Sequence, residues 1–121
     1  MGLEQLLERL RLNPESVEFE QVMETIAGHY RFTATGFCNG SADEFVDNAA
    51  GSNEGSCKVF AFAKLHGLDM AQTLACFGRY YRQDVLQHPE GTDHANIRSF
   101  MRHGPAGISF AVAPLVPRAR D

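Results

Sequence analysis

Apolar residues recur at helical spacing in two stretches near the start of the chain. In each stretch they occupy positions i, i+3, i+4 and i+7, which places them on one face of a helix. Between the stretches, Asn13 and Pro14 form the pattern of a helix cap followed by proline, and Gly28 is expected to end the second helix. We expect the two helices to pack as an antiparallel pair. The stripes consist of Leu3, Leu6, Leu7 and Leu10, and of Phe19, Val22, Met23 and Ile26.

The spacing then changes to alternation, which is typical of strands. Residues 29–37 alternate around Tyr30 and Phe32, and a second alternating run covers 107–113. These two strands could pair into one small sheet. Asn39 and Gly40 indicate a turn after the first strand, and residues 41–56, which are rich in glycine and serine, are interpreted as a long structured loop.

Three further helices are expected between these strands. The third covers about 54–66, is capped by Ser52 or Asn53, and is apolar nearly all round, which indicates a central buried helix. A capping box at Asp69 opens a long fourth helix that continues to Pro89. The fifth begins at residue 92 or 93 and ends before Gly104. The pattern predicts an α+β fold, mostly helical, with about five helices and a small β-sheet from strands near 29–37 and 107–113, as a single domain over 1–121. The core stripe of the fourth helix is Met70, Leu74, Phe77, Tyr81 and Val85.

Composition narrows the classes of function. The 121 residues carry 11 basic and 15 acidic side chains, a net charge of −4 without a block of like charge, so we expect no nucleic-acid partner. No apolar stretch approaches the roughly 20 residues of a membrane span. Three cysteines without a CxxC pair favour a reducing compartment over a disulfide scaffold. The histidines lack zinc-site spacing, so no metal and no cofactor are expected.

A glycine-rich segment at the start of the third helix is the first candidate site. Backbone amides at a helix start can bind an anion, and the candidate residues here are Asn53, Ser56, Cys57 and Lys58. The alternative, which we favour, is a capped helix entry. Cys57 lies in the first turn beside a lysine, so a reactive thiolate with His94 as its base is a further alternative to a small buried hydrophobe.

A turn before the fifth helix is the second candidate site. It gathers Asp93, His94, Asn96 and Arg98 within six residues. Local capping of the helix and an ion pair at Arg98 would account for these residues without a ligand. If the turn and the segment 52–58 meet in space, they could form one pocket for a small anionic molecule.

Three stretches of specific residues resemble the HopJ type III effector protein family. They cover 53–65, 73–86 and 88–101, within a similarity that runs from about Tyr30 to Phe110. The resemblance implies a small bacterial protein of a family whose name records delivery into host cells, and it carries no catalytic role onto any residue here. Type III export signals are usually flexible and rich in serine, whereas this chain begins with a leucine-rich helix. We therefore expect the bacterial cytoplasm, with type III export implied by the family name alone.

These observations favour a protein that acts through protein–protein interaction with an unknown protein partner. The alternative is a binder of a small molecule or anion at 52–58 and 93–98. We do not expect an enzyme, and thiol or metal chemistry at Cys57 and His94 is the remaining alternative. No membrane partner is expected.

Overall fold

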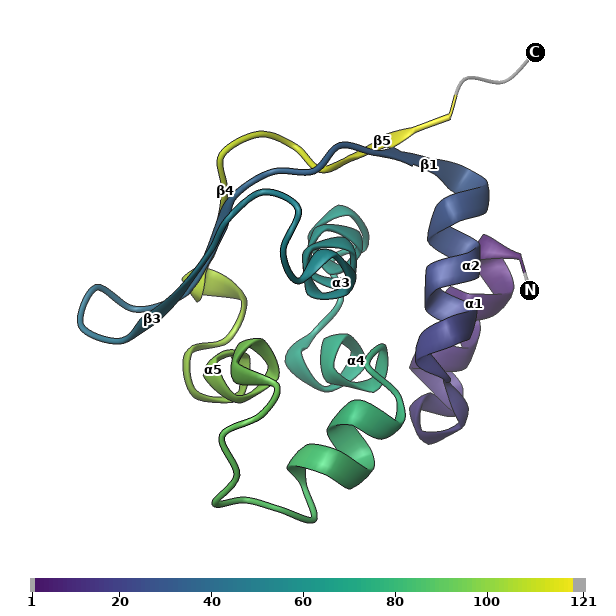
Figure 1. Cartoon of the computed structure of the whole chain (residues 1–121). Coiled ribbons are helices and arrows are strands. Elements are labelled where there is room, and N and C mark those ends of the chain that lie inside the picture. Colours follow the sequence, from purple (N-terminus) through teal and green to yellow (C-terminus); the bar gives the residue numbers. More distant parts are fainter. Residues whose placement is uncertain (1, 119–121) are drawn as a thin grey trace.

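Helices surround a central helix in the structure, and short strands form two small antiparallel sheets beside them (Figure 1). This computed structural model describes residues 2–118. The α+β class expected from the sequence is confirmed. In chain order the elements are α1 (Leu3–Leu12), the 3₁₀ turn η1 (Pro14–Ser16), α2 (Phe19–His29), β1 (Tyr30–Phe32), β2 (Phe37–Gly40), β3 (Phe45–Asn48), α3 (Glu54–His66), α4 (Met70–Ala75), the π-helical segment η2 (Tyr80–Val85), α5 (Ala95–His103), the 3₁₀ turn η3 (Pro105–Gly107), β4 (Ile108–Phe110) and β5 (Leu115–Pro117).

The two N-terminal helices bury the stripes predicted for them. Leu6 and Leu10 of α1 and Val22 and Ile26 of α2 are all buried in the core. The second helix begins later than expected, because the residues from Pro14 form only the 3₁₀ turn η1. It starts instead where the Gln21 side chain accepts a hydrogen bond from the Glu18 amide at 3.0 Å, and it ends at His29 rather than Gly28.

The helix α3 lies at the centre of the molecule, with α1 and α2 on one side and the β2–β4 sheet on the other (Figure 1). Its sequence is apolar nearly all round because most of its faces contact other elements, as predicted. Phe60 packs against Phe77 and Phe100, with ring centroids 5.5 and 5.1 Å apart, so α3 joins the fourth helical region and α5 into one core. Its buried residues are Cys57, Val59, Phe60, Ala61, Phe62 and Ala63.

The long fourth helix expected from the sequence is interrupted. Its capping box is present, since the Asp69 carboxylate accepts from the Gln72 amide at 2.7 Å, but α4 ends at Ala75. Gly78 then adopts a φ of +58°, and a Cβ there would lie 2.7 Å from the Phe19 backbone nitrogen. Gly78 therefore lies directly against the start of α2, and beyond it the chain resumes as the π-helical segment η2.

The strand expected at 29–37 is divided into β1 and β2, each of which pairs with a different part of the C-terminal segment. β2 pairs with β4, with Phe37 opposite Phe110. This contact lies within the predicted pairing of residues 29–37 with residues 107–113. β1 pairs with β5, which lies beyond the predicted run. The segment 41–56, interpreted as a loop, contains β3, which forms a hairpin with β2. β3 was missed because its consecutive apolar residues Phe45 and Val46 do not alternate.

Candidate functional site

The candidate residues at the start of α3 point toward protein groups rather than toward one anion site. The Lys58 ammonium lies over the Phe32 ring, 4.7 Å from its centroid. Ser56 is half-buried in the first turn. The Asn53 amide donates to Asn48 Oδ1 at 2.8 Å. Asn53 is the N-cap residue of α3, with a left-handed φ of 51°, but its side chain makes no capping hydrogen bond, so the cap expected from the sequence is not formed.

The Cys57 thiol is buried against the core. Burial raises its pKa to about 11, and the nearby Glu54 carboxylate acts in the same direction while Lys58 opposes it. Within residues 2–118 no hydrogen bond joins Cys57 to His94, whose ring contacts Asp84 instead. The geometry therefore does not assemble the thiol–imidazole pair considered from the sequence.

A network of buried asparagine side chains connects β2, β3 and α5. Asn96, at the start of α5, donates to Asn48 Oδ1 at 2.9 Å and accepts from Asn48 Nδ2 at 3.0 Å. Asn39 donates to the Asn96 carbonyl at 2.7 Å. Asn53 reaches the same Asn48 oxygen from the start of α3. The two candidate segments, 52–58 and 93–98, are thus joined through Asn48. The amide groups of this network bond mainly to one another.

The roles of Asn39 and Asn48 were not predicted from the sequence. Asn39 is fully buried in β2, although the Asn39–Gly40 pair was interpreted as a turn. Asn48 is buried in β3, within the segment interpreted as a loop. Both asparagines satisfy polar backbone or side-chain groups inside the protein, a role that depends on partners distant in the sequence.

The turn before α5 forms a second polar cluster with η2. The helix starts at Ala95, later than predicted, because His94 adopts a left-handed conformation with a φ of 51°. His94 Nε2 lies 2.9 Å from Asp84 Oδ2 and 3.8 Å from Asp93 Oδ2. The His94 ring also packs on the Tyr80 ring, with centroids 5.3 Å apart.

Arg98 stabilises this turn through hydrogen bonds to Asp93. Its guanidinium donates to Asp93 Oδ1 at 2.7 Å and to the Asp93 carbonyl at 2.6 Å. A weaker contact at 3.5 Å reaches the Asp84 carbonyl. The hydrogen bond from Arg98 lowers the pKa of the Asp93 carboxyl group. Asp93, His94 and Arg98 thus lie together as predicted, with Asp84 as an additional member from η2.

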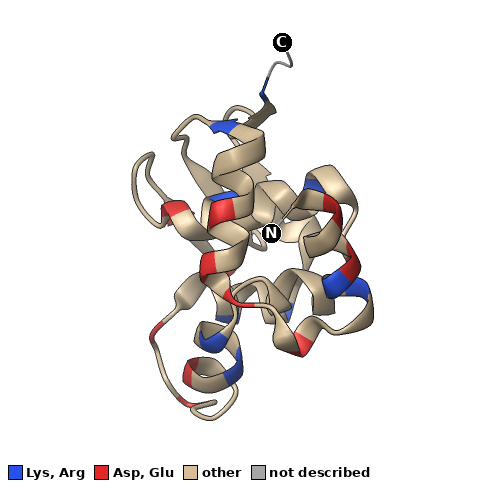
Figure 2. Cartoon of the chain, turned by 90° about the vertical axis from the view of Figure 1, so that its right-hand side faces the viewer, with Lys and Arg blue, Asp and Glu red and all other residues tan. Residues whose placement is uncertain are grey.

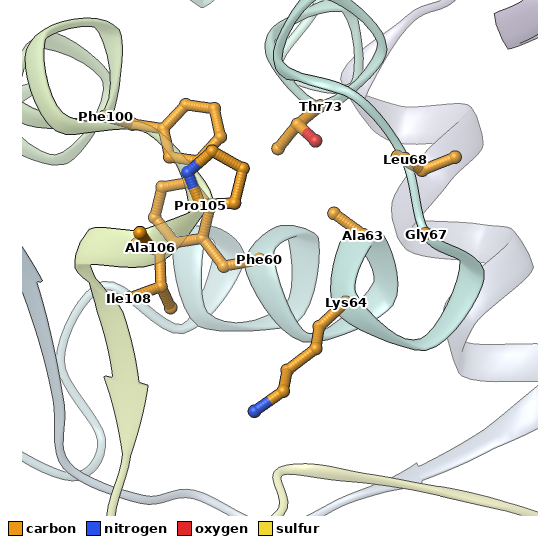
Figure 3. Close-up of a pocket in the computed structure, with 10 residues that line it drawn as sticks. All are labelled: Phe60, Ala63, Lys64, Gly67, Leu68, Thr73, Phe100, Pro105, Ala106 and Ile108. Atoms are coloured by element: carbon orange, nitrogen blue, oxygen red, sulfur yellow. The ribbon is translucent and has the colours of Figure 1, made fainter.

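An apolar groove follows α3 on the side of the C-terminal segment. It consists of two adjoining hollows of about 370 and 540 Å³. The first lies between α3, α5 and η3, and the second between α3 and residues 110–115. Lys64 lines both, and its side chain extends from α3 away from Phe60 and Phe100 (Figure 3). We call these two hollows the α3 groove. None of the candidate residues from the sequence lines it.

Lys64 is the charged residue of the α3 groove. No ion pair or hydrogen bond joins its ammonium group to another residue in the described part of the chain. The remaining lining is almost entirely apolar side chains, glycine and proline. The apolar residues of α3 were expected in the core, because no spacing signal in the sequence separates residues that line a groove from residues that are enclosed.

The opposite side of the molecule, formed by α1 and α2, carries charges of both signs. Figure 2 shows Lys and Arg residues interspersed with Asp and Glu residues on this side. Within residues 2–118 no helix combines the length and apolar character needed to cross a membrane.

Comparison with known proteins places the chain in a family. The sequence model of the HopJ type III effector protein family matches residues 3–115, which is nearly the whole chain. The protein belongs to the HopJ type III effector protein family. This HopJ domain is also similar to a solved structure described as the crystal structure of the unknown function protein VPA0580. The two share 49% sequence identity and a TM-score of 0.92, over 98% of this chain and 95% of the other. Among curated proteins, no relative matches the chain.

Proposed function

We propose that this HopJ domain binds an apolar segment of a partner protein in the α3 groove. The observation that carries the proposal is the pair of hollows along α3, which share Lys64, are lined by apolar residues and are both partly open to solvent. Two apolar hollows along one helix can each receive a side chain of the same peptide segment, which is how apolar grooves bind peptides.

Exposed apolar side chains beside the groove support this proposal. Leu65 and Val112 line the second hollow and are 51% and 55% exposed. Clustered exposed apolar residues are typical of protein interaction sites, whereas single ones are ordinary surface features. A partner that covers both residues would remove this apolar surface from water, at about 25 cal/mol per Å².

The alternative, a small-anion site at 52–58 and 93–98, has weaker support. Lys58 faces the Phe32 ring, and Arg98 is held by Asp93. The cations that would attract the anion are therefore already engaged with protein groups.

We place this binding in the bacterial cytoplasm. The three cysteines are all free, which is typical of proteins in a reducing compartment. Export through a type III system is implied by the family name alone.

The test is selection of binding peptides and location of their site. A random peptide library displayed on phage is selected against the wild-type protein, and the enriched peptides are titrated into ¹⁵N-labelled protein. We expect enriched peptides to be apolar and to shift amide signals of α3 and of residues 105–115. Leu65→Glu should weaken their binding by about ten-fold or more, because a carboxylate would be buried beneath the peptide.

The matched control is Leu12→Glu. Leu12 is also an exposed leucine, at 69%, but it lies on α1 outside the groove. This variant should bind the selected peptides as the wild type does. Peptides whose signal changes map outside α3 and 105–115, or whose affinity Leu65→Glu leaves unchanged, would refute the proposal.

A further inference from the structure

Folding brings together three side chains that can serve as metal ligands, from two separate segments. Asp84 belongs to η2, while Asp93 and His94 precede α5. One ligand atom from each lies within 4.8 Å of the other two. The geometry points to a binding site for one divalent transition-metal ion, of the class of Zn²⁺ or Mn²⁺, held by Asp84, Asp93 and His94. This site is separate from the α3 groove and does not depend on the function proposed for it.

The distances between the ligand atoms suit a shared ion. Imidazole nitrogens and carboxylate oxygens bind such ions at about 2.0–2.2 Å, so two ligands of one ion lie about 3–4 Å apart. His94 Nε2 lies 2.9 Å from Asp84 Oδ2 and 3.8 Å from Asp93 Oδ2. The same imidazole nitrogen thus faces both carboxylates. Without an ion it is hydrogen-bonded to Asp84 at 2.9 Å, and a bound ion would take the place of the proton in that bond.

The chemical character of the three ligands selects the class of ion. An imidazole together with carboxylates is typical of sites for zinc, iron and manganese, whereas magnesium and calcium sites use oxygen ligands. The side chains of Asp84 and Asp93 are about half exposed, so water would complete the coordination of the ion. Three protein ligands with open positions describe a site in which a bound ion could also contact an outside ligand.

Neighbouring residues already hold two of the ligands in place. Arg98 binds Asp93 Oδ1 at 2.7 Å, so Oδ2 is the Asp93 oxygen that faces His94. The Tyr80 ring packs against the His94 imidazole. Support of this kind fixes the orientation of metal ligands and reduces the entropy lost when the ion binds.

The sequence did not predict this site because its ligands do not share one helix face. Adjacent aspartate and histidine residues carry no spacing signal, and Asp84 is nine residues away from the nearer of them. The π-helical turns of η2 and the left-handed conformation of His94 place the three side chains together.

Metal-free protein titrated with Zn²⁺ by calorimetry, and with Mn²⁺ by NMR, tests the proposal. We expect one Zn²⁺ per chain, and selective broadening by substoichiometric Mn²⁺ of the amide signals of 83–85 and 92–95. Asp84→Asn and His94→Asn should each weaken Zn²⁺ binding by about ten-fold or more and abolish the selective broadening. Asparagine is chosen at His94 because it tolerates the left-handed conformation, so the variant keeps the turn.

His88→Asn is the matched control, because His88 is an exposed histidine of the same connecting segment and lies outside the cluster. It should bind both ions as the wild type does. Thermal unfolding of all three variants establishes that they fold. Absence of Zn²⁺ binding at millimolar concentration, or binding that survives in folded Asp84→Asn and His94→Asn, would overturn the proposal. The variant Leu65→Glu should retain metal binding, so failure of the groove proposal and failure of the metal site are distinguishable.

Discussion

At the scale of single residues, the Cys57 thiol illustrates how burial governs reactivity. A thiol at a helix start beside a lysine can become a thiolate, yet here burial dominates and raises the pKa to about 11. Because the pKa is raised, the neutral thiol is the form present at pH 8, with about one thiolate in a thousand. Cys76 is buried as well, and burial raises its pKa to about 12.

We therefore predict that iodoacetamide at pH 8 leaves Cys57 and Cys76 of the native protein unmodified. Only the half-buried Cys38 should react, slowly. Peptide mapping by mass spectrometry identifies the labelled site. In guanidinium chloride all three cysteines should react, which serves as the control. If Cys57 of the native protein is labelled as fast as Cys38, its thiol is accessible, and the hypothesis of a reactive thiolate at the start of α3 would be supported again.

The buried asparagines show which residue roles the sequence could not reveal. The buried positions Leu6, Leu10, Val22 and Ile26 were predicted correctly, because an apolar stripe at helical spacing marks the face of a helix that packs against the core. An amide such as Asn48 is equally suited to a turn, a helix cap or a buried network. Which of these it forms depends on Asn39 and Asn96, whose positions the fold determines.

At the scale of elements, the interruption after α4 depends on one glycine. Gly78 combines a left-handed φ of +58° with a position where a Cβ would lie 2.7 Å from the Phe19 nitrogen. We predict that Gly78→Ala lowers the free energy of unfolding by more than the roughly 1–2 kcal/mol of the left-handed conformation alone, since the contact adds to it. Denaturation in urea, followed by circular dichroism, measures the change.

Gly28→Ala is the control for this substitution. Gly28 lies inside α2, and nothing lies within 4 Å of a Cβ built there. Alanine should therefore stabilise the helix, by about 0.5–1 kcal/mol. If the two variants have equal stability, tight contact between Gly78 and α2 is not what interrupts the helix.

The elements predicted incorrectly share a physical cause. The capping box at Asp69 correctly located the start of α4, because it is made within four residues. After α4 ends at Ala75 the chain passes Gly78, which lies against the start of α2, and β3 forms by pairing with β2. Neither contact leaves a local signal, so the long helix and the loop were expected in their place.

At the scale of the whole molecule, the candidate sites were predicted in part. Asp93, His94 and Arg98 lie together beside η2, whereas Asn96 belongs to the buried asparagine network, which reaches Asn53 through Asn48. The α3 groove and the contribution of Asp84 were not predicted, since both arise where segments distant in sequence meet. The groove exists because the C-terminal segment returns across α3 to pair with β2 and then with β1.

The C-terminal segment is held beside β1 by backbone pairing, by Arg118 and by one buried leucine. β5 has three residues, too few for an isolated strand to be stable. Leu115 lies opposite Phe32 and is 4% exposed, whereas its neighbour Val116 is 51% exposed. Arg118 adds a backbone hydrogen bond to the His29 carbonyl at 3.0 Å, and its guanidinium donates to the Ala27 carbonyl at 3.0 and 3.1 Å. We expect Leu115 to contribute more to stability than these hydrogen bonds do. Truncating a buried leucine costs the protein the free energy of burying the removed atoms and leaves a cavity in the packing.

We predict that Leu115→Ala lowers the free energy of unfolding by about 2–4 kcal/mol. Val116→Ala, one residue along the same strand, should change it by about 0.5 kcal/mol or less. Hydrogen exchange at the amides of 30–33 and 115–118 shows where the stability is lost. We expect faster exchange there in Leu115→Ala than in Val116→Ala, since loosening of β5 exposes the backbone of β1. Equal exchange in the two variants would mean that backbone pairing, and not the buried leucine, holds the C-terminal segment against α3 and maintains that wall of the groove.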